Sequence, residues 1–184
     1  MIYESDRKYT LNDEFEELSS VSREFAQLRH RHSIEYHAKS FTILWKSLDE
    51  FLVQTGAEIE EDAFHLTGPE LFQAHDLPLM ARQRRYYLYS ESVDDVSPAK
   101  LCCHMLVIDD GTRSQSYCLL LISETAIERD ELLETAKKYE VDKRVSNLLE
   151  YLDTKGKSRS GRLPRWEEFR ELANEYGPFE RAVH

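Results

Sequence analysis

Histidine and cysteine side chains gather at two places in the 184-residue sequence, and both groups contain potential metal ligands. The residues concerned are His30, His32, His37, Cys102, Cys103, His104 and Cys118. Zinc prefers four nitrogen or sulfur ligands in a tetrahedral arrangement. On a strand, Cys102 and His104 share one face and Cys103 points to the other, so at most two ligands converge there. We therefore expect no metal and no other cofactor, and we interpret the cysteines as small core residues.

Paired acidic residues are a second potential source of chemistry, because carboxylates can hold the cation of a metal-dependent nuclease. They occur at 60–62, 94–95 and 109–110, in segments typical of loops and turns, where aspartate bonds to nearby backbone. The six glycines form neither GxGxxG nor GxxxxGK, and GxSxG and HExxH do not occur in the sequence. Enzymatic activity is therefore left open, with a non-enzymatic role favoured.

A basic segment, KGKSRSGRLPRW at residues 155–166, contrasts with an acidic chain of net charge −11. It holds Lys155, Lys157, Arg159, Arg162 and Arg165 and no acid. Its glycine and serine content predicts a flexible linker over 154–163, followed by an amphipathic helix within 164–184. Basic side chains of this kind can contact phosphates or an acidic protein surface. We predict a nucleic-acid or partner contact within residues 155–170.

A second basic group, ARQRRYY at residues 81–87, combines Arg82, Arg84 and Arg85 with two tyrosines. Arginine and aromatic side chains together can stack on bases or form an interface hot spot. The alternative is an edge strand with a solvated, charged end. We include the three arginines among the predicted contacts with nucleic acid or a partner.

The segment RHSIEYH places Arg31 six residues before His37 in a region predicted to be helical. This arginine–histidine pattern resembles the catalytic motif of HEPN-family ribonucleases. The resemblance implies a dimer in which arginine and histidine from two protomers meet and cleave RNA without a metal ion. Arg31 would stabilise the phosphate, and His37 would act as acid or base. The alternative is a polar helix face that carries several histidines.

The segment ELANEYGPFERAV near the end of the chain resembles the core of a helix-turn-helix. Ala173, Gly177 and Val183 fall at the small, glycine and aliphatic positions of that motif. The resemblance implies a DNA-binding regulator, with basic residues of the preceding segment on phosphates and a short helix approaching the groove. The alternative is an amphipathic helix that docks on the main domain or on a partner.

The spacing of apolar residues predicts the elements that would position these side chains. Steps of three and four predict helix over 10–55, as one long helix or a helical hairpin. Apolar runs predict strands near 84–90, 100–108 and 113–122, and a type I′ turn at Asp110-Gly111 would place Cys103 opposite Cys118. Helix returns over 124–153. We therefore predict an α+β fold, with a small antiparallel sheet packed against helices in a core domain over 1–153.

Composition limits the setting in which the protein works. The net charge of −11 opposes general attraction to nucleic acid or to anionic membranes. No apolar run approaches the roughly 20 residues that span a bilayer, so no membrane association is expected. Three cysteines without CxxC spacing favour a reducing, cytoplasmic compartment. The long N-terminal helical region predicts an oligomer, for example a homodimer through the N-terminal helices.

These observations favour a non-enzymatic regulatory or interaction protein. Its acidic α+β body would bind a protein partner, and its basic tail would contact nucleic acid or an acidic surface. The first alternative is a HEPN-like, metal-independent ribonuclease that acts as a dimer. The second is a DNA-binding regulator with a C-terminal tail like a helix-turn-helix.

Overall fold

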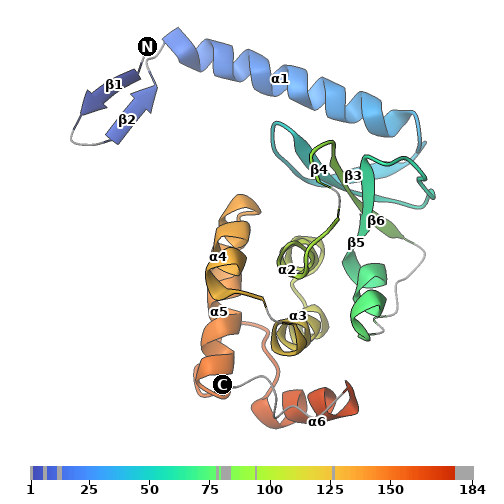
Figure 1. The fold of residues 1–184 in the computed structure, drawn as a ribbon, viewed down its shortest axis with the longest axis vertical. Helices are drawn as coiled ribbons and strands as arrows, with labels where there is room; N and C mark the ends of the chain where they lie inside the picture. The colour runs from blue at the N-terminus through green and yellow to red at the C-terminus, as the bar shows by residue number, and fades with distance from the viewer. Residues whose placement is uncertain are drawn as a thin grey trace.

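The computed structural model describes residues 2–5, 8–11, 14–77, 79, 84–93, 95–125 and 127–176, with side chains from residue 20 onward. A hairpin of β1 (Ile2–Ser5) and β2 (Lys8–Leu11) precedes the long helix α1 (Glu14–Glu35). Figure 1 shows that α1 crosses one face of a small sheet, while helices α2 to α6 gather beyond the other face. The predicted α+β class is confirmed.

The sheet has four antiparallel strands in the order β3-β4-β6-β5. The strands are β3 (Phe41–Lys46), β4 (Glu50–Thr55), β5 (Phe64–Thr67) and β6 (Arg85–Ser90), so the strand predicted near 84–90 is confirmed. Successive side chains of a strand point to opposite faces. On β4, Phe51 and Val53 therefore pack with Ile34 beneath α1, while Glu50 reaches Lys138 on the helical side.

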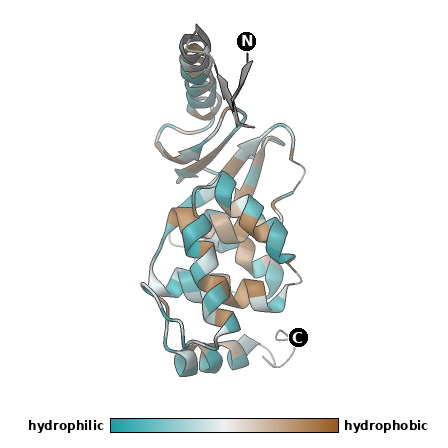
Figure 2. Cartoon of the chain, turned by 90° about the vertical axis from the view of Figure 1, so that its left-hand side faces the viewer, coloured by the Kyte–Doolittle hydropathy of each residue, from teal (hydrophilic) through white to brown (hydrophobic). Residues whose placement is uncertain are grey.

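A larger core lies among the helices on the far side of the sheet. The elements are the 3₁₀ helix η1 (Gly68–His75), α2 (Pro98–Ile108), α3 (Thr112–Glu124), α4 (Arg129–Lys138), α5 (Asp142–Asp153) and α6 (Trp166–Tyr176). Ser97 caps α2 by accepting a hydrogen bond from the Lys100 amide at 3.3 Å, and Pro98 begins the helix. Apolar and polar segments alternate along these helices in Figure 2, as expected for helices packed on a shared core.

The helix predicted over residues 10–55 is correct only for α1. Residues 41–55 instead form the hairpin of β3 and β4, closed by a hydrogen bond from the Ser47 amide to the Glu50 carbonyl at 2.8 Å. A bulge between Ile43 and Trp45 shifts the register of β3. The bulge interrupts simple alternation, so the apolar spacing of this strand also fits a helical period.

The strands predicted near 100–108 and 113–122 are wrong, because these residues form α2 and α3. The predicted type I′ turn is the connection between the two helices, and Gly111 precedes α3. Cys103 and Cys118 are therefore not cross-strand partners, and the Cys118 thiol lies 3.6 Å from the Cys102 carbonyl oxygen. Residues 101–106 are all buried, so this run is apolar on every side and its periodicity does not separate strand from helix.

The segment predicted as a flexible linker is a loop with contacts to the helical core, and its flexibility stays a prediction. Leu163 is 1% exposed and belongs to the same core as Phe169 and Ala173 of α6. The Arg159 guanidinium donates to the Leu163 carbonyl at 2.8 Å. Because both ends of the segment are held by the helical core, α6 docks on the main body. Among the described helices, none combines the length and the apolar composition needed to cross a bilayer.

Candidate functional site

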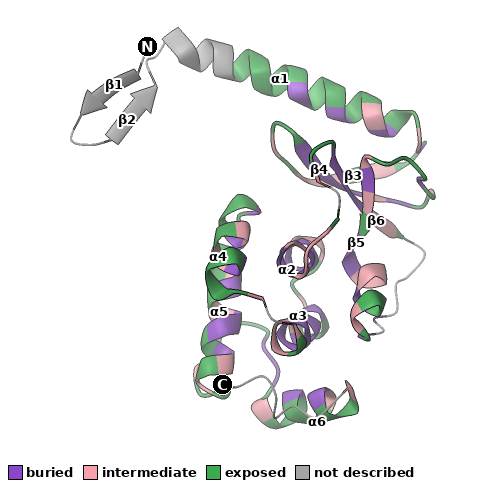
Figure 3. Cartoon of the chain, in the orientation of Figure 1, coloured by how far each residue is buried: buried purple, intermediate pink, exposed green. Residues whose placement is uncertain are grey.

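Helix α1 has two apolar faces. Ala26, His30 and Ile34 lie four residues apart, are buried, and cover the sheet. Three other side chains form a second row, here called the outer face of α1: Val21, Phe25 and Leu28. At 100° per residue, the outer face lies nearly opposite the buried one. The outer-face side chains are 63%, 71% and 68% exposed, and the same side of α1 is drawn as exposed in Figure 3.

This exposure is unusual for a helix that already packs on its own domain. A surface helix ordinarily presents one apolar stripe to the core and a polar face to water. Exposed apolar side chains in a contiguous row mark interaction surfaces more often than isolated ones do. The described part of the chain buries none of the three. The outer face of α1 is therefore the strongest candidate site for a protein contact.

Charge is unevenly distributed along α1. The first half of its sequence, residues 14–24, contains four glutamates and one arginine. The second half, residues 25–35, contains two arginines and one glutamate, together with two histidines. The helix is thus acidic toward its start and basic toward its end, a pattern that matches itself when two copies run antiparallel.

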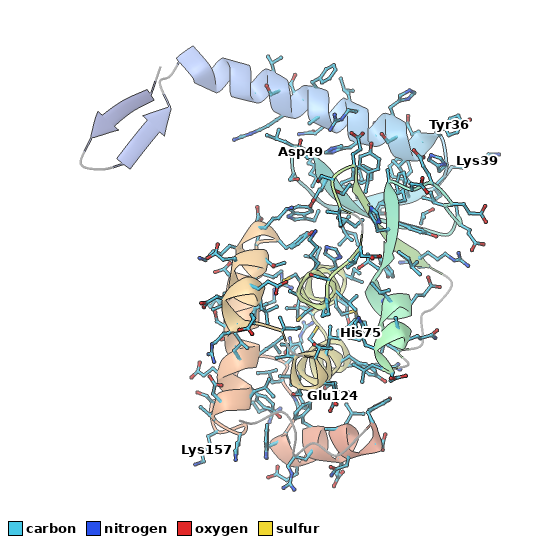
Figure 4. The ribbon with its side chains drawn as sticks, in the orientation of Figure 1. Tyr36, Lys39, Asp49, His75, Glu124 and Lys157 are labelled. Atoms are coloured by element: carbon cyan, nitrogen blue, oxygen red, sulfur yellow. The ribbon has the colours of Figure 1, made fainter. Side chains whose placement is uncertain are left out.

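A cavity of about 760 Å³ lies at the end of α1. Its lining combines two groups that are separate in the sequence: His32, Ser33, Tyr36, His37, Glu60, Glu61 and Asp62. The His37 ring pairs with the Glu61 carboxylate and packs edge-on against Phe64, with ring centroids 5.4 Å apart. Tyr36, labelled in Figure 4, lies at the outer end of the helix. A histidine held by a carboxylate can transfer protons, provided a substrate reaches it.

The pair expected for a ribonuclease does not converge within one copy. Arg31 is on α1 and bonds Glu35 at 2.6 Å, one turn further along the helix. His37 lies beyond the end of α1 and bonds Glu61 instead. Arg31 does not line the His37 cavity. The two side chains therefore serve separate carboxylates, and ribonuclease activity stays a prediction.

Of the remaining histidines and cysteines of the predicted metal groups, His32 is exposed and the others are buried. His30 packs against Phe51 and Tyr89, and its pKa is lowered, chiefly by burial and then by Arg29. His104 bonds the Thr67 hydroxyl at 2.8 Å, and burial lowers its pKa to about 3. The three cysteines are buried free thiols. Over the residues that the structure describes, no three potential ligands are grouped to hold a metal ion.

The predicted basic contacts divide into free and engaged side chains. Within the described residues, Lys155, Lys157, Arg165 and Arg84 are exposed and make no ion pair. Arg162 pairs with Asp110, and Arg85 pairs with Glu58 at 2.6 Å and more distantly with Glu70. Arg82 lies outside the described residues, as do Gly177 and Val183 of the predicted helix-turn-helix. Three of the four free side chains, those of Lys155, Lys157 and Arg165, lie in the loop after α5.

An ion pair between a buried glutamate and a partly exposed lysine links the sheet to the helices and was not anticipated from the sequence. Glu50 of β4 is 4% exposed and pairs with Lys138 of α4 at 2.6 Å. The Ser90 hydroxyl donates to the same carboxylate at 3.3 Å. Tyr139 lies beside it, and its pKa is raised, chiefly by burial and then by the Glu50 charge. These contacts hold the four-stranded sheet against the helical core.

Comparison with known proteins shows the family to which this chain belongs. A family model described as HVO_2833_C, C-terminal, matches residues 61–178, which is more than half of the chain. The chain belongs to this family. The description names no activity. No curated protein matches the chain, and no solved structure does.

The HVO_2833_C family span divides the features described above. It includes β5, β6 and helices α2 to α6, and it crosses the boundary predicted after residue 153. Helix α1 and strands β3 and β4 lie outside it. The outer face of α1 is therefore a feature of this chain that the family match does not cover, whereas the basic loop after α5 lies inside the family span.

Proposed function

We propose that this protein is an interaction protein that associates with a second copy of itself through the outer faces of two α1 helices. The observation that carries the proposal is the row of Val21, Phe25 and Leu28, exposed opposite the face that covers the sheet. Burying such a row removes apolar surface from water, which is the dominant favourable term in protein association. A second helix of the same kind provides a matching row.

An antiparallel arrangement of the two helices fits the order of residues along α1. Phe25 lies beside the midpoint of the helix Glu14–Glu35. A two-fold axis close to Phe25 would place Val21 of one copy against Leu28 of the other, and the two phenylalanines near each other. The same axis would bring the acidic half of one helix beside the basic half of its mate. Two-fold pairs with identical patches are the commonest form of homo-oligomer.

The expected dimer is weak, because the outer face is small. Each of the three side chains on both copies would contribute about 1 to 2 kcal/mol on burial. Association costs at least about 4 kcal/mol in lost freedom of motion. The difference of about 2 to 8 kcal/mol corresponds to a dissociation constant between roughly 1 μM and tens of mM. The basic loop after α5 is not needed for this pairing.

Sedimentation velocity over a wide range of protein concentration tests the proposal. The mass should rise from that of the 21.7 kDa monomer toward the dimer as concentration increases. Phe25→Glu places two like charges near the axis and should keep the protein monomeric at every concentration. Gln27→Glu is the matched control, because it adds the same charge at an exposed position of α1 outside the outer face.

Two results would contradict self-association through this face. The first is a wild-type mass that stays at the monomer value throughout. The second is an equal effect of Phe25→Glu and Gln27→Glu, which would indicate a response to charge alone. Circular dichroism should confirm that each variant folds, because Phe25 is 71% exposed and makes little contribution to the core.

A further inference from the structure

The loop between α5 and α6, residues 154–165, has a shape fixed by its own backbone, and it is called the basic loop below. It begins where α5 ends, with the Gly156 amide bonded to the Tyr151 carbonyl at 2.8 Å and the Lys155 amide bonded to the Leu152 carbonyl at 3.1 Å. Lys155 and Gly156 have φ of 51° and 77°. These bonds and the left-handed residues form a Schellman-type helix end.

Packing around Gly156 and Leu163 holds the rest of the basic loop. A Cβ at Gly156 would lie 2.6 Å from the Cβ of Trp166, so the loop passes close to the start of α6. The Ser158 amide donates to the Thr154 hydroxyl at 3.0 Å. Leu163 and Pro164 are buried. The side chains of the loop are therefore presented from a backbone that packs against α6.

The basic loop offers cations to solvent and contains no acid. Lys155, Lys157 and Arg165 are exposed and make no ion pair with the described residues. Arg162 pairs with Asp110, but both side chains of that pair are more than half exposed. An exposed ion pair contributes little stability and can be exchanged for another anion. Up to four cations are thus available to a ligand.

Acidic groups on neighbouring elements do not cancel these charges directly. Asp153 bonds Arg129 at 2.9 Å, and Glu150 accepts from the Ser158 hydroxyl. Glu168 accepts from the Arg165 amide at 3.1 Å, which leaves the guanidinium free. The net charge of −11 for the whole chain repels a polyanion elsewhere on the surface. A polyanion would therefore be attracted mainly to the basic loop.

From this geometry we infer that the basic loop binds the phosphate backbone of nucleic acid, without regard to base sequence. Protein interfaces are anchored by exposed aromatic and aliphatic side chains. The apolar residues of this region do not serve as such anchors, because Leu163 is buried and Trp166 packs against Tyr151 at 5.5 Å between ring centroids. The loop presents cationic side chains, hydroxyl groups and backbone amides, which are the groups that bind phosphate oxygens.

The number of free cations sets the expected salt dependence. If Lys155, Lys157 and Arg165 each neutralise one phosphate of a duplex, log K should fall with log salt with a slope near −3. The contact is small, so binding should be weak at physiological salt and clear at low salt. Binding of nucleic acid by the basic loop should not depend on α1. The loop lies at the end of the molecule opposite α1, where Figure 4 labels Lys157.

Fluorescence anisotropy with a short labelled DNA duplex and an RNA duplex of the same sequence tests the inference. The full chain is compared with a loop variant, Lys155→Gln/Lys157→Gln/Arg165→Gln. The control variant, Lys39→Gln/Lys46→Gln/Lys143→Gln, removes the same charge from exposed positions on other elements. The loop variant should bind about tenfold more weakly or worse at low salt, and its salt slope should fall toward zero. The control should retain most of the wild-type affinity.

Three outcomes would overturn the inference. Wild-type protein that shows no salt-sensitive binding to either duplex would exclude the contact. Equal loss of affinity in both variants would mean that general charge, and not the basic loop, is responsible. Binding of poly-glutamate as tight as binding of the duplexes would assign the loop to an acidic protein surface. Phe25→Glu should leave binding to the short duplexes unchanged, so failure of the dimer and failure of this contact are distinguishable.

Discussion

His104 should make the stability of the fold strongly dependent on pH. Its ring is fully buried, bonds the Thr67 hydroxyl at 2.8 Å, and packs edge-on against Tyr139 with ring centroids 4.6 Å apart. Burial, and to a lesser degree the charges of Lys100 and Lys138, lower its pKa to about 3. In the folded protein His104 is therefore neutral over the range in which a free histidine takes up a proton.

The sign and size of the effect follow from proton linkage. Because the folded pKa is depressed, the unfolded chain binds one more proton than the folded chain between about pH 6.5 and about pH 3. The free energy of unfolding should fall by about 1.4 kcal/mol for each pH unit across that window. Relative to neutral pH, the loss from His104 should reach about 2 kcal/mol at pH 5. Buried His30 acts in the same direction, because its pKa is also lowered.

Urea unfolding at several pH values between neutrality and pH 4.5 measures this slope. His104→Asn keeps a polar atom near Thr67 and removes the group that titrates, so its slope should be smaller than that of the wild type by about 1.4 kcal/mol per pH unit. His32→Asn is the control, since His32 is exposed on α1 and has no burial to lose. Wild type and His104→Asn with the same slope would refute the reasoning, and would mean that His104 reaches water or a counterion in the folded state.

Two further changes test individual contacts that stabilise the fold. Lys138→Met leaves the buried Glu50 carboxylate without its partner and should destabilise the protein by about 3 kcal/mol in urea unfolding. Adding Glu50→Gln should recover part of that loss, and no recovery would show that the ion pair is not the cause. Gly156→Ala should lower the free energy of unfolding by about 1 to 3 kcal/mol, because φ is 77° and the new Cβ would meet Trp166. Gly161→Ala should cost less, since φ is 64° but the space is open, and an equal cost at both sites would mean that the contact with Trp166 is unimportant.

Local signals in the sequence predict some elements well and mislead at others. The tyrosine-rich strand β6 and the long helix α1 follow from composition and spacing. The helix α2 was missed because residues 101–106 are apolar on every side, although Ser97 and Pro98 mark a helix start. The pairing of β3 with β4 was missed because a bulge at Ile43 and Trp45 interrupts alternation. Burial on all sides and local irregularity thus remove the periodic signal on which such predictions depend.

The sequence also predicts only part of each candidate site. Spacing identifies Phe25 and Leu28 as members of an apolar stripe, but it does not say that Ala26, His30 and Ile34 form the face that packs on the sheet. A histidine reads as polar in sequence, so the spacing of apolar residues does not reveal the buried row that contains His30. Charge composition singles out the basic loop in the sequence, while its packing against Trp166 is a contact that no local pattern contains.

The two proposed surfaces can be separated by mutation, because the fold keeps them apart. The outer face of α1 lies across the sheet from the helical core, and the basic loop is anchored in that core through Gly156 and Leu163 (Figures 1 and 4). Antiparallel pairing of two α1 helices would leave both basic loops away from the contact, so one dimer would present two phosphate-binding loops. A nucleic acid long enough to reach both loops should then bind more tightly than a short one, because the second contact becomes intramolecular. Phe25→Glu should remove this length dependence and leave the intrinsic affinity of each loop unchanged. A length dependence that persists in Phe25→Glu would show that avidity does not arise from α1, and the two surfaces would have to be coupled by another route.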